Sequence, residues 1–274
     1  QGPESRRESP KPTTPWVKTR RPRMDVARVL GWSFTLGAAC VRHAQGQAPI
    51  EPASDLDLGA QFLWQTFGRL PSPEAVRAFE VSLIVQAEHD LHAAALAALA
   101  VASGGGTLDE AVLAGVGALG GALHGGANRP AFEMLQSFAT ADEARVWARE
   151  RAAAKHRFPG YGHRVYKTHD PRGRVLLPVA QTLLQQQVPE GPKLLAIHEA
   201  IRQEVEGALG TKGIFANVDA FTGLVYHGLG LPAASFTLPF ALAIQVGWMA
   251  HIVEYEPGRA APLSPHTIYS GPHE

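Results

Sequence analysis

The sequence predicts an all-α protein, and three observations carry this prediction. Apolar residues recur at helical spacing over long stretches, among them residues 194–209 and 218–229. Helix start and stop signals flank such stretches, with Thr107 opening a capping box and Gly210 following a stripe. No stretch alternates apolar and polar residues in the way that a half-buried strand does.

Composition narrows the class of protein. With 274 residues, of which 45% are hydrophobic, the chain can bury the core of one large or two modest domains. Lys plus Arg and Asp plus Glu both number 25, so the formal charge cancels and we expect no nucleic-acid or membrane partner. The only cysteine is Cys40, which excludes an internal disulfide and fits a cytoplasmic protein. The apolar run 29–41 is too short to span a bilayer, and the polar first residues do not resemble a signal peptide.

The order of elements follows from these signals. Residues 1–23, with five prolines among basic and polar residues, are expected to form a flexible arm, and a nucleic-acid-binding tail is the alternative. Residues 46–59 read as a polar linker. Ser72 should cap a helix that runs to Val101. A last long helix should begin at Thr237 and end before Pro257 and Gly258.

Three short segments place an ionisable side chain among glycines or at a helix start. The first, Leu123–Asn128, puts His124 near the start of a helix, where the dipole favours a neutral imidazole. The second, Pro159–Tyr166, presents His163 and is followed by Arg172, a fork that can hold a carboxylate. The third places Asp219 in a first helical turn. Taken singly, each segment could be an ordinary turn, polar loop or helix start.

Together, in this order, the three segments resemble the citrate synthase family. The resemblance extends from about Met24 to Gly271 and leaves the N-terminal part of the family's large domain without a counterpart. It implies a citrate-synthase-like all-α fold, with a large helical domain over residues 24–125 and 231–274 and a smaller helical domain over residues 126–230. It also implies a homodimer with the active site in the cleft, and a role in the tricarboxylic acid cycle.

The resemblance implies a condensation of acetyl-CoA with oxaloacetate or a related 2-keto acid, followed by hydrolysis of the thioester. Asp219 matches the base that removes a proton from the acyl carbon. His124 matches the donor to the thioester oxygen, and His163 matches the group that polarises the keto carbonyl. His89 and Arg172 match groups that hold the keto acid. The expected contacts with coenzyme A are the backbone of Gly160, Tyr161 and Gly162 and the Lys167 ammonium.

No permanently bound cofactor is expected, because coenzyme A enters as part of a substrate. No metal is expected either, because His89 and His92 are three residues apart on one helical face without a nearby third ligand.

Two family arginines that grip substrate carboxylates are replaced, by Ile244 and by Ser264. Arg259 or His266 could substitute for a lost clamp. We therefore expect better tolerance of keto acids with one carboxylate, with Ile244 packing on an apolar tail. Ile244→Arg should then shift the preference towards oxaloacetate.

Two alternatives stay open at the level of sequence. One is a lyase that runs the reverse cleavage of a citryl-CoA-type thioester on the same residues. The other is a catalytically weak paralogue that acts as a partner subunit of a longer chain. The lost arginines favour the paralogue, and the presence of His124, His163 and Asp219 opposes it.

Overall fold

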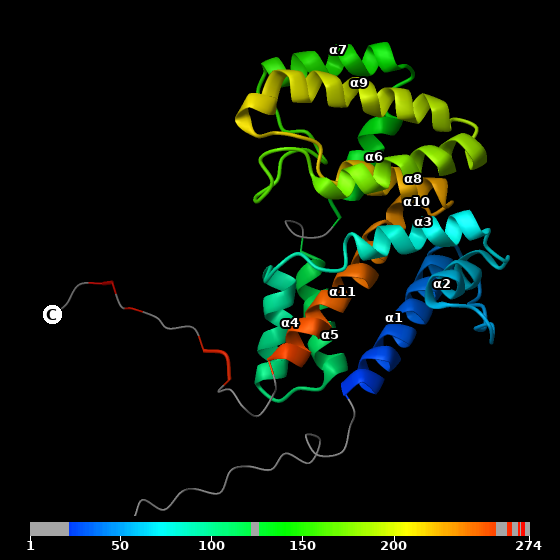
Figure 1. Cartoon of the computed structure of the whole chain (residues 1–274), viewed down its shortest axis with the longest axis vertical. Coiled ribbons are helices and arrows are strands. Elements are labelled where there is room, and N and C mark those ends of the chain that lie inside the picture. Colours follow the sequence, from blue (N-terminus) through cyan, green and yellow to red (C-terminus); the bar gives the residue numbers. More distant parts are fainter. Residues whose placement is uncertain (1–21, 122–125, 256–261, 265–267, 269, 272–274) are drawn as a thin grey trace, which may run out of the picture.

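The computed structural model describes residues 22–121, 126–255, 262–264, 268, 270 and 271. Across this part of the chain the only strand-like pairing is a single bridge between Tyr161 and Ala216, so the all-α prediction is confirmed (Figure 1). The helices are α1 (Pro22–Ala44), α2 (Leu58–Phe67), α3 (Pro73–Ile84), α4 (Ala93–Ser103), α5 (Leu108–Leu119), α6 (Asn128–Gln136), α7 (Ala141–Ala153), α8 (Pro171–Gln187), α9 (Gly191–Leu209), α10 (Val218–Gly228) and α11 (Thr237–Glu254), with short 3-10 turns η2 (Gly210–Lys212) and η3 (Ala233–Ser235).

Several helix ends form as the sequence indicates. The Ser72 side chain caps α3, and Thr107 and Glu110 cap α5 reciprocally. Gly210 follows α9, and the linker over residues 46–59 is non-helical until α2 begins. The arm over residues 1–23 lies outside the described residues except for its last two positions, which open α1, and residues 257 and 258 also lie outside them.

The single helix expected from Ser72 to Val101 is wrong. The chain forms two helices, α3 and α4, separated by the irregular segment 85–92. Asp90 in this segment has a φ of 61°, a left-handed conformation that interrupts a helix, and its side chain accepts a hydrogen bond from the Leu91 N–H at 2.8 Å. The apolar periodicity continues on both sides, which conceals the break in the sequence. We call residues 85–92 the site segment, because His89 lies in it.

A glycine in α11 lets the site segment approach closely. The Gly247 N–H donates to the Ala87 carbonyl oxygen at 2.9 Å. A Cβ atom at position 247 would lie only 2.7 Å from that oxygen, so a larger residue would push the site segment away. The packing of α11 therefore fixes the backbone two residues before His89.

Figure 1 shows the helices in two groups joined along the long axis of the molecule. Helices α1, α2, α4, α5 and α11 lie in one half, α6 to α10 lie in the other, and α3 lies between them. The main core is continuous across both groups, from Phe62 and Phe79 to Tyr226, whereas α4, α5 and α11 enclose a smaller cluster around Trp248. The predicted division into a large and a small domain stays a prediction.

Helix α11 is largely buried at the centre of the group formed by α1, α2, α4 and α5. Among the described residues, the stretch 233–254 is the one that is long and apolar enough to cross a membrane, and more than half of it is buried inside the protein. It packs against α1, α3, α4 and α5. A core helix passes the same test of length and composition, and the packing accounts for its apolar character.

Candidate active site

The start of α10 carries Asp219 and is tied to the glycine-containing loop. The Asn217 side chain accepts a hydrogen bond from the Asp219 N–H at 3.0 Å, so Asn217 is the N-cap as predicted. The other end of the Asn217 amide donates to the Gly162 carbonyl at 2.8 Å, and the Asn217 N–H donates to the Gly160 carbonyl at 2.9 Å. One asparagine therefore fixes Asp219 relative to the loop that leads into His163.

Several backbone groups of that loop are hydrogen-bonded within the protein. Gly160 and Gly162 have φ angles of 78° and 82°, and a Cβ at position 160 would lie 3.0 Å from the Ala220 nitrogen. The Tyr161 N–H donates to the Phe158 carbonyl at 3.2 Å, and the Gly162 N–H donates to the Phe215 carbonyl at 2.8 Å. These two N–H groups, like the Gly160 and Gly162 carbonyls, already have partners within the protein, so contact of coenzyme A with this loop would depend mainly on the shape of the loop.

A buried carboxylate, Asp170, joins the remaining parts of the site. Its side chain is 1% exposed and accepts two hydrogen bonds from the Arg172 guanidinium, at 3.0 Å from Nε and 2.7 Å from Nη2. It also accepts the Val218 N–H at 3.0 Å, in the first turn of α10. The pairing fixes the guanidinium beside the start of α10 and leaves its Nη1 edge for a ligand.

The tautomer of His163 is set by the backbone. Its Nδ1 accepts hydrogen bonds from the N–H groups of Val165 and Tyr166, both at 3.0 Å. The neutral ring must then carry its proton on Nε2. Burial, and next the Arg172 charge, lower the pKa of His163, which keeps the ring neutral at physiological pH. His163 is therefore a neutral hydrogen-bond donor.

His89 reaches this donor from the other half of the molecule. The Nε2 atoms of His89 and His163 lie 3.1 Å apart, so the neutral His163 N–H donates and His89 accepts. Burial, followed by the Arg172 charge, lowers the pKa of His89 as well. The Arg172 Nη2 lies 3.5 Å from the same His163 nitrogen. The two histidines and the arginine thus converge on one point.

The electrostatics of Asp219 differ from those of an ordinary surface carboxylate. Burial raises the pKa of Asp219 to about 6, and the Arg172 charge opposes this only in part. A carboxylate with this pKa is ionised at neutral pH and is still basic enough to accept a proton from a weak carbon acid. The site thus combines a base, a neutral N–H donor and a cation.

A family model described as the citrate synthase C-terminal domain matches residues 6–262. The chain belongs to the citrate synthase family. The citrate synthase of Deinococcus radiodurans is 35% identical over 244 residues, which are 89% of this chain and 64% of that protein. The 2-methylcitrate synthase of Mycobacterium tuberculosis is 35% identical over 254 residues, which are 92% of this chain and 62% of that protein.

Solved structures agree with this assignment. A citrate synthase of Thermoplasma acidophilum, in a ternary complex with carboxymethyl coenzyme A and oxaloacetate, matches with a TM-score of 0.84 at 30% identity. The match covers 92% of this chain and 67% of that one. The chain therefore spans about two thirds or less of the length of each of these three proteins.

Two further predicted site residues of this citrate synthase family member are His124 and Lys167. His124 lies outside the described residues, so its role stays a prediction. Lys167 is exposed, and its ammonium donates to the His163 carbonyl at 2.9 Å, next to the loop. Its predicted contact with the phosphates of coenzyme A stays a prediction, and the position of Lys167 is compatible with it.

The replacements of the family arginines occupy different environments. Ile244 is 1% exposed and belongs to the cluster around Trp248 and Ala98. The expectation that its side chain packs on a substrate tail is therefore not supported by the structure, because the chain's own helices already cover it. Ser264 is exposed, while Arg259 and His266 lie outside the described residues.

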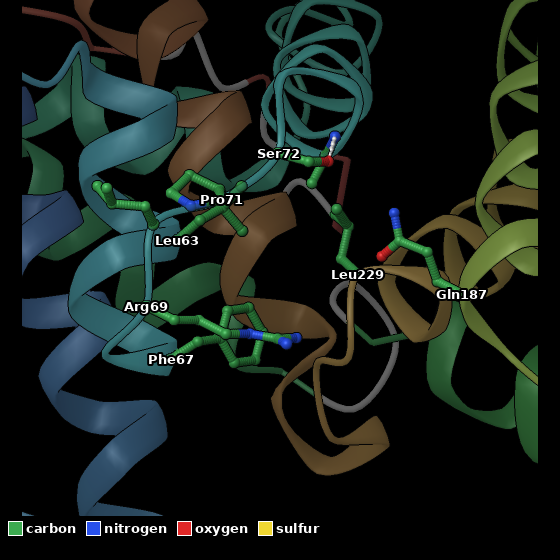
Figure 2. A pocket seen from close by; sticks show the side chains of 9 residues that line it. Leu63, Phe67, Arg69, Pro71, Ser72, Gln187 and Leu229 are labelled. Atoms are coloured by element: carbon green, nitrogen blue, oxygen red, sulfur yellow. Dashed lines mark hydrogen bonds between the residues drawn. The ribbon is translucent and has the colours of Figure 1, made fainter.

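No metal site competes with this cluster in the described residues. There, no group of three or more His, Cys, Asp or Glu side chains could hold a metal ion. His92 lies against Trp248, whose indole N–H donates to it at 3.4 Å. A cavity of about 230 Å³ lies between the α2–α3 connection and the ends of α8 and α10 (Figure 2), and it is lined by Leu63, Phe67, Arg69, Leu70, Pro71, Ser72, Ala75, Gln187 and Leu229. None of the predicted site residues lines it.

Asp170 is the functional residue that sequence reasoning missed. The sequence shows it only as the first residue of Asp-Pro-Arg, where it caps α8 through the Arg172 N–H. That capping signal could have been read. The hydrogen bond that it accepts from the Val218 N–H joins residues 48 positions apart and has no local signal.

Asp170→Ala should strongly destabilise the protein, because it leaves the Arg172 charge and the Val218 N–H without a partner. Breaking a buried pair of this kind costs about 3–5 kcal/mol. The matched control is Glu204→Ala, which removes the 3.0 Å pair with the exposed Arg149 and should cost less than about 1 kcal/mol. Urea denaturation of both variants measures the difference. Equal losses would show that Asp170 has no special structural role.

Ile244→Arg should unfold or destabilise the protein rather than shift its substrate preference. The guanidinium would be buried among alanines without a partner, at a cost above about 3 kcal/mol. Val246→Arg, at a position on the same helix that is 40% exposed, should change stability by less than about 0.5 kcal/mol. Thermal denaturation compares them. A stable Ile244→Arg variant that prefers oxaloacetate would restore the original expectation.

Proposed function

We propose that the chain is an acyl-CoA:2-keto acid carbon–carbon ligase, which condenses acetyl-CoA with oxaloacetate or a related keto acid and then hydrolyses the thioester. The observation that carries the proposal is the joint fixation of Asp219 and His163. Asn217 caps the helix of Asp219 and holds the carbonyl of Gly162, the residue before His163. A base and a neutral donor held by one side chain suit proton abstraction beside a thioester and attack on a ketone.

The condensation step follows from this arrangement. Asp219 accepts a proton from the methyl carbon of the acyl group, and the electron pair of that C–H bond moves into an enolate. By resemblance, His124 donates to the enolate oxygen. The enolate carbon then attacks the keto carbon, and the Nε2 proton of His163 passes to the new alkoxide. Water afterwards attacks the thioester carbonyl, and coenzyme A leaves as the thiol.

Binding of the keto acid falls to the groups around His163. The Nη1 edge of Arg172, which has no hydrogen-bond partner among the described residues, can pair with a carboxylate while Asp170 holds the opposite edge. His89 and the keto oxygen compete for the same His163 proton, so a bound keto acid takes the place of the contact between the two rings. The ternary complex of the Thermoplasma acidophilum enzyme supports coenzyme A and oxaloacetate as the substrate classes. We propose no permanently bound cofactor.

We propose a homodimer that uses the exposed face of α4 and α5. Leu113 and Val116, three residues apart on α5, are 68% and 45% exposed, and Leu96 on the adjacent α4 is 47% exposed. An apolar face of this kind fits a second copy of the chain, since homodimers have the more apolar interfaces. A cytoplasmic location and a place in the tricarboxylic acid cycle also stay proposals.

The citryl-CoA-type lyase and the weakly active partner subunit remain the alternatives. The buried Ile244 and exposed Ser264 favour the partner subunit, because neither position supplies a cation to the site. An assay of coenzyme A release across a panel of 2-keto acids and acyl-CoA thioesters separates the three. Release that depends on a keto acid supports the ligase, and cleavage of a citryl-CoA supports the lyase. If the protein catalyses neither reaction, the result supports the partner subunit.

Asp219→Asn should abolish hydrogen exchange at the acyl α-carbon, by more than about a hundredfold, because it removes the base. In the wild type, kcat should rise with pH through about 6, since Asp219 must lose its proton to act. Exchange of acetyl-CoA protons in deuterium oxide, followed by NMR, measures both. The raised pKa means that ionised Asp219 opposes folding above pH 6, so Tm of the Asn variant at pH 7 should not fall. Unchanged exchange in the variant would remove Asp219 from the mechanism.

Leu113→Glu should convert the dimer to a monomer at micromolar concentration, because a buried unpaired charge opposes association. Val146→Glu is the matched control, at a position on α7 that is 53% exposed and away from α5. Light scattering gives the mass of each variant. A monomeric wild type, or a Leu113→Glu variant that remains dimeric, would contradict the proposed interface.

A further inference from the structure

A fully buried hydrogen bond joins the two halves of the molecule behind the candidate site. The Gln86 side-chain amide nitrogen donates to the Tyr226 hydroxyl at 2.9 Å, and the two residues are 1% and 0% exposed. Gln86 lies at the beginning of the site segment, after α3, and Tyr226 lies in α10. The bond connects residues 140 positions apart in the sequence.

Each partner is close in the chain to a predicted site residue. Gln86 precedes His89 by three residues, within the same irregular segment. Tyr226 follows Asp219 by seven residues, which is two helical turns, so both side chains lie on one face of α10. The Asp219 charge contributes to the raised pKa of the Tyr226 hydroxyl, behind the larger effect of burial. The hydrogen bond therefore links the segment that carries the ligand-holding histidine to the helix that carries the base.

The geometry of the amide is fixed on both of its N–H groups. Besides Tyr226, the Gln86 nitrogen donates to the Ser82 carbonyl in the last turn of α3 at 2.8 Å. The Gln86 oxygen is buried and has no hydrogen-bond partner among the described residues. Two apolar residues at positions 86 and 226 would avoid the cost of burying an oxygen without a hydrogen-bond partner. Core packing alone therefore does not account for Gln86 and Tyr226. Only the directional contact with Tyr226 distinguishes the pair from ordinary core packing.

We propose that Gln86 and Tyr226 are positioning residues that hold His89 at its contact distance from His163. The site segment is also held by α11 beyond this bond: the Ala87 carbonyl accepts the Gly247 N–H, Glu88 lies 3.0 Å from His251, and His92 accepts from the Trp248 indole. All of these contacts are with α11, so the Tyr226 hydroxyl is the contact that ties the segment to α10, and without it His89 moves away from His163 and Arg172. The part of the proposal that concerns binding of a keto acid by His89 rests on the proposed function. The part that concerns the contact between the His89 and His163 rings does not.

Tyr226→Phe tests the proposal through the two histidines. Both rings have a pKa lowered by burial and by the Arg172 charge. In the variant, the pKa of His89 should rise towards the ordinary value of a histidine, because the ring leaves the guanidinium. NMR titration of labelled histidines measures this, with the His89 signal assigned from a His89→Gln variant. In the same protein KM for oxaloacetate should rise by about tenfold, while kcat falls less, because Asp219 stays in place.

The matched control is Thr222→Val. Thr222 is 0% exposed on the same helix, and its hydroxyl has no hydrogen-bond partner among the described residues. It should leave the pKa of His89 unchanged. The double variant Gln86→Leu, Tyr226→Phe should regain stability relative to Tyr226→Phe but keep the altered His89 titration. A Tyr226→Phe variant with lower Tm and an unchanged His89 pKa would overturn the proposal. Absence of oxaloacetate-dependent turnover in the wild type, with the His89 shift present, would overturn the proposed function alone.

Discussion

The Asp170 carboxylate is the interaction on which the geometry of the site depends. It is buried, so the desolvation free energy of its charge must be offset by hydrogen-bond donors that lie close to it with good geometry. Those partners are the Arg172 guanidinium and the Val218 N–H, which lie in the first turns of α8 and α10. Because one side chain accepts from both, Arg172 and the helix start that carries Asp219 cannot move independently.

Local signals in the sequence were sufficient for most of the fold. Thr107 and Asn217 cap their helices through contacts with residues two or three positions away, which a sequence displays directly. The loop and the two helix starts that carry His163, Arg172 and Asp219 each have a short motif, and the structure brings them together, while their roles stay predictions. These predictions needed no knowledge of what packs against what.

The errors arose where distant contacts decide the structure. The end of α3 depends on Asp90 in a left-handed conformation and on the approach of Ala87 to Gly247, 160 residues away. The helical spacing of apolar residues continues across this break, so spacing alone predicts one uninterrupted helix. Ile244 was expected to face the substrate because of its place in a motif, yet helix packing turns it into the cluster around Trp248. A motif specifies a position along a helix, and the neighbouring helices determine what covers it.

The internal hydrogen bonding of the Gly160–Gly162 loop has a thermodynamic consequence for ligand binding. Its backbone is already anchored at Phe158, Phe215 and Asn217. A long, flexible molecule that lies along this loop meets a preorganised surface, so the ordering entropy of the complex comes almost entirely from the ligand. Truncating the ligand should therefore change the entropy of binding more than any stiffening of the loop could.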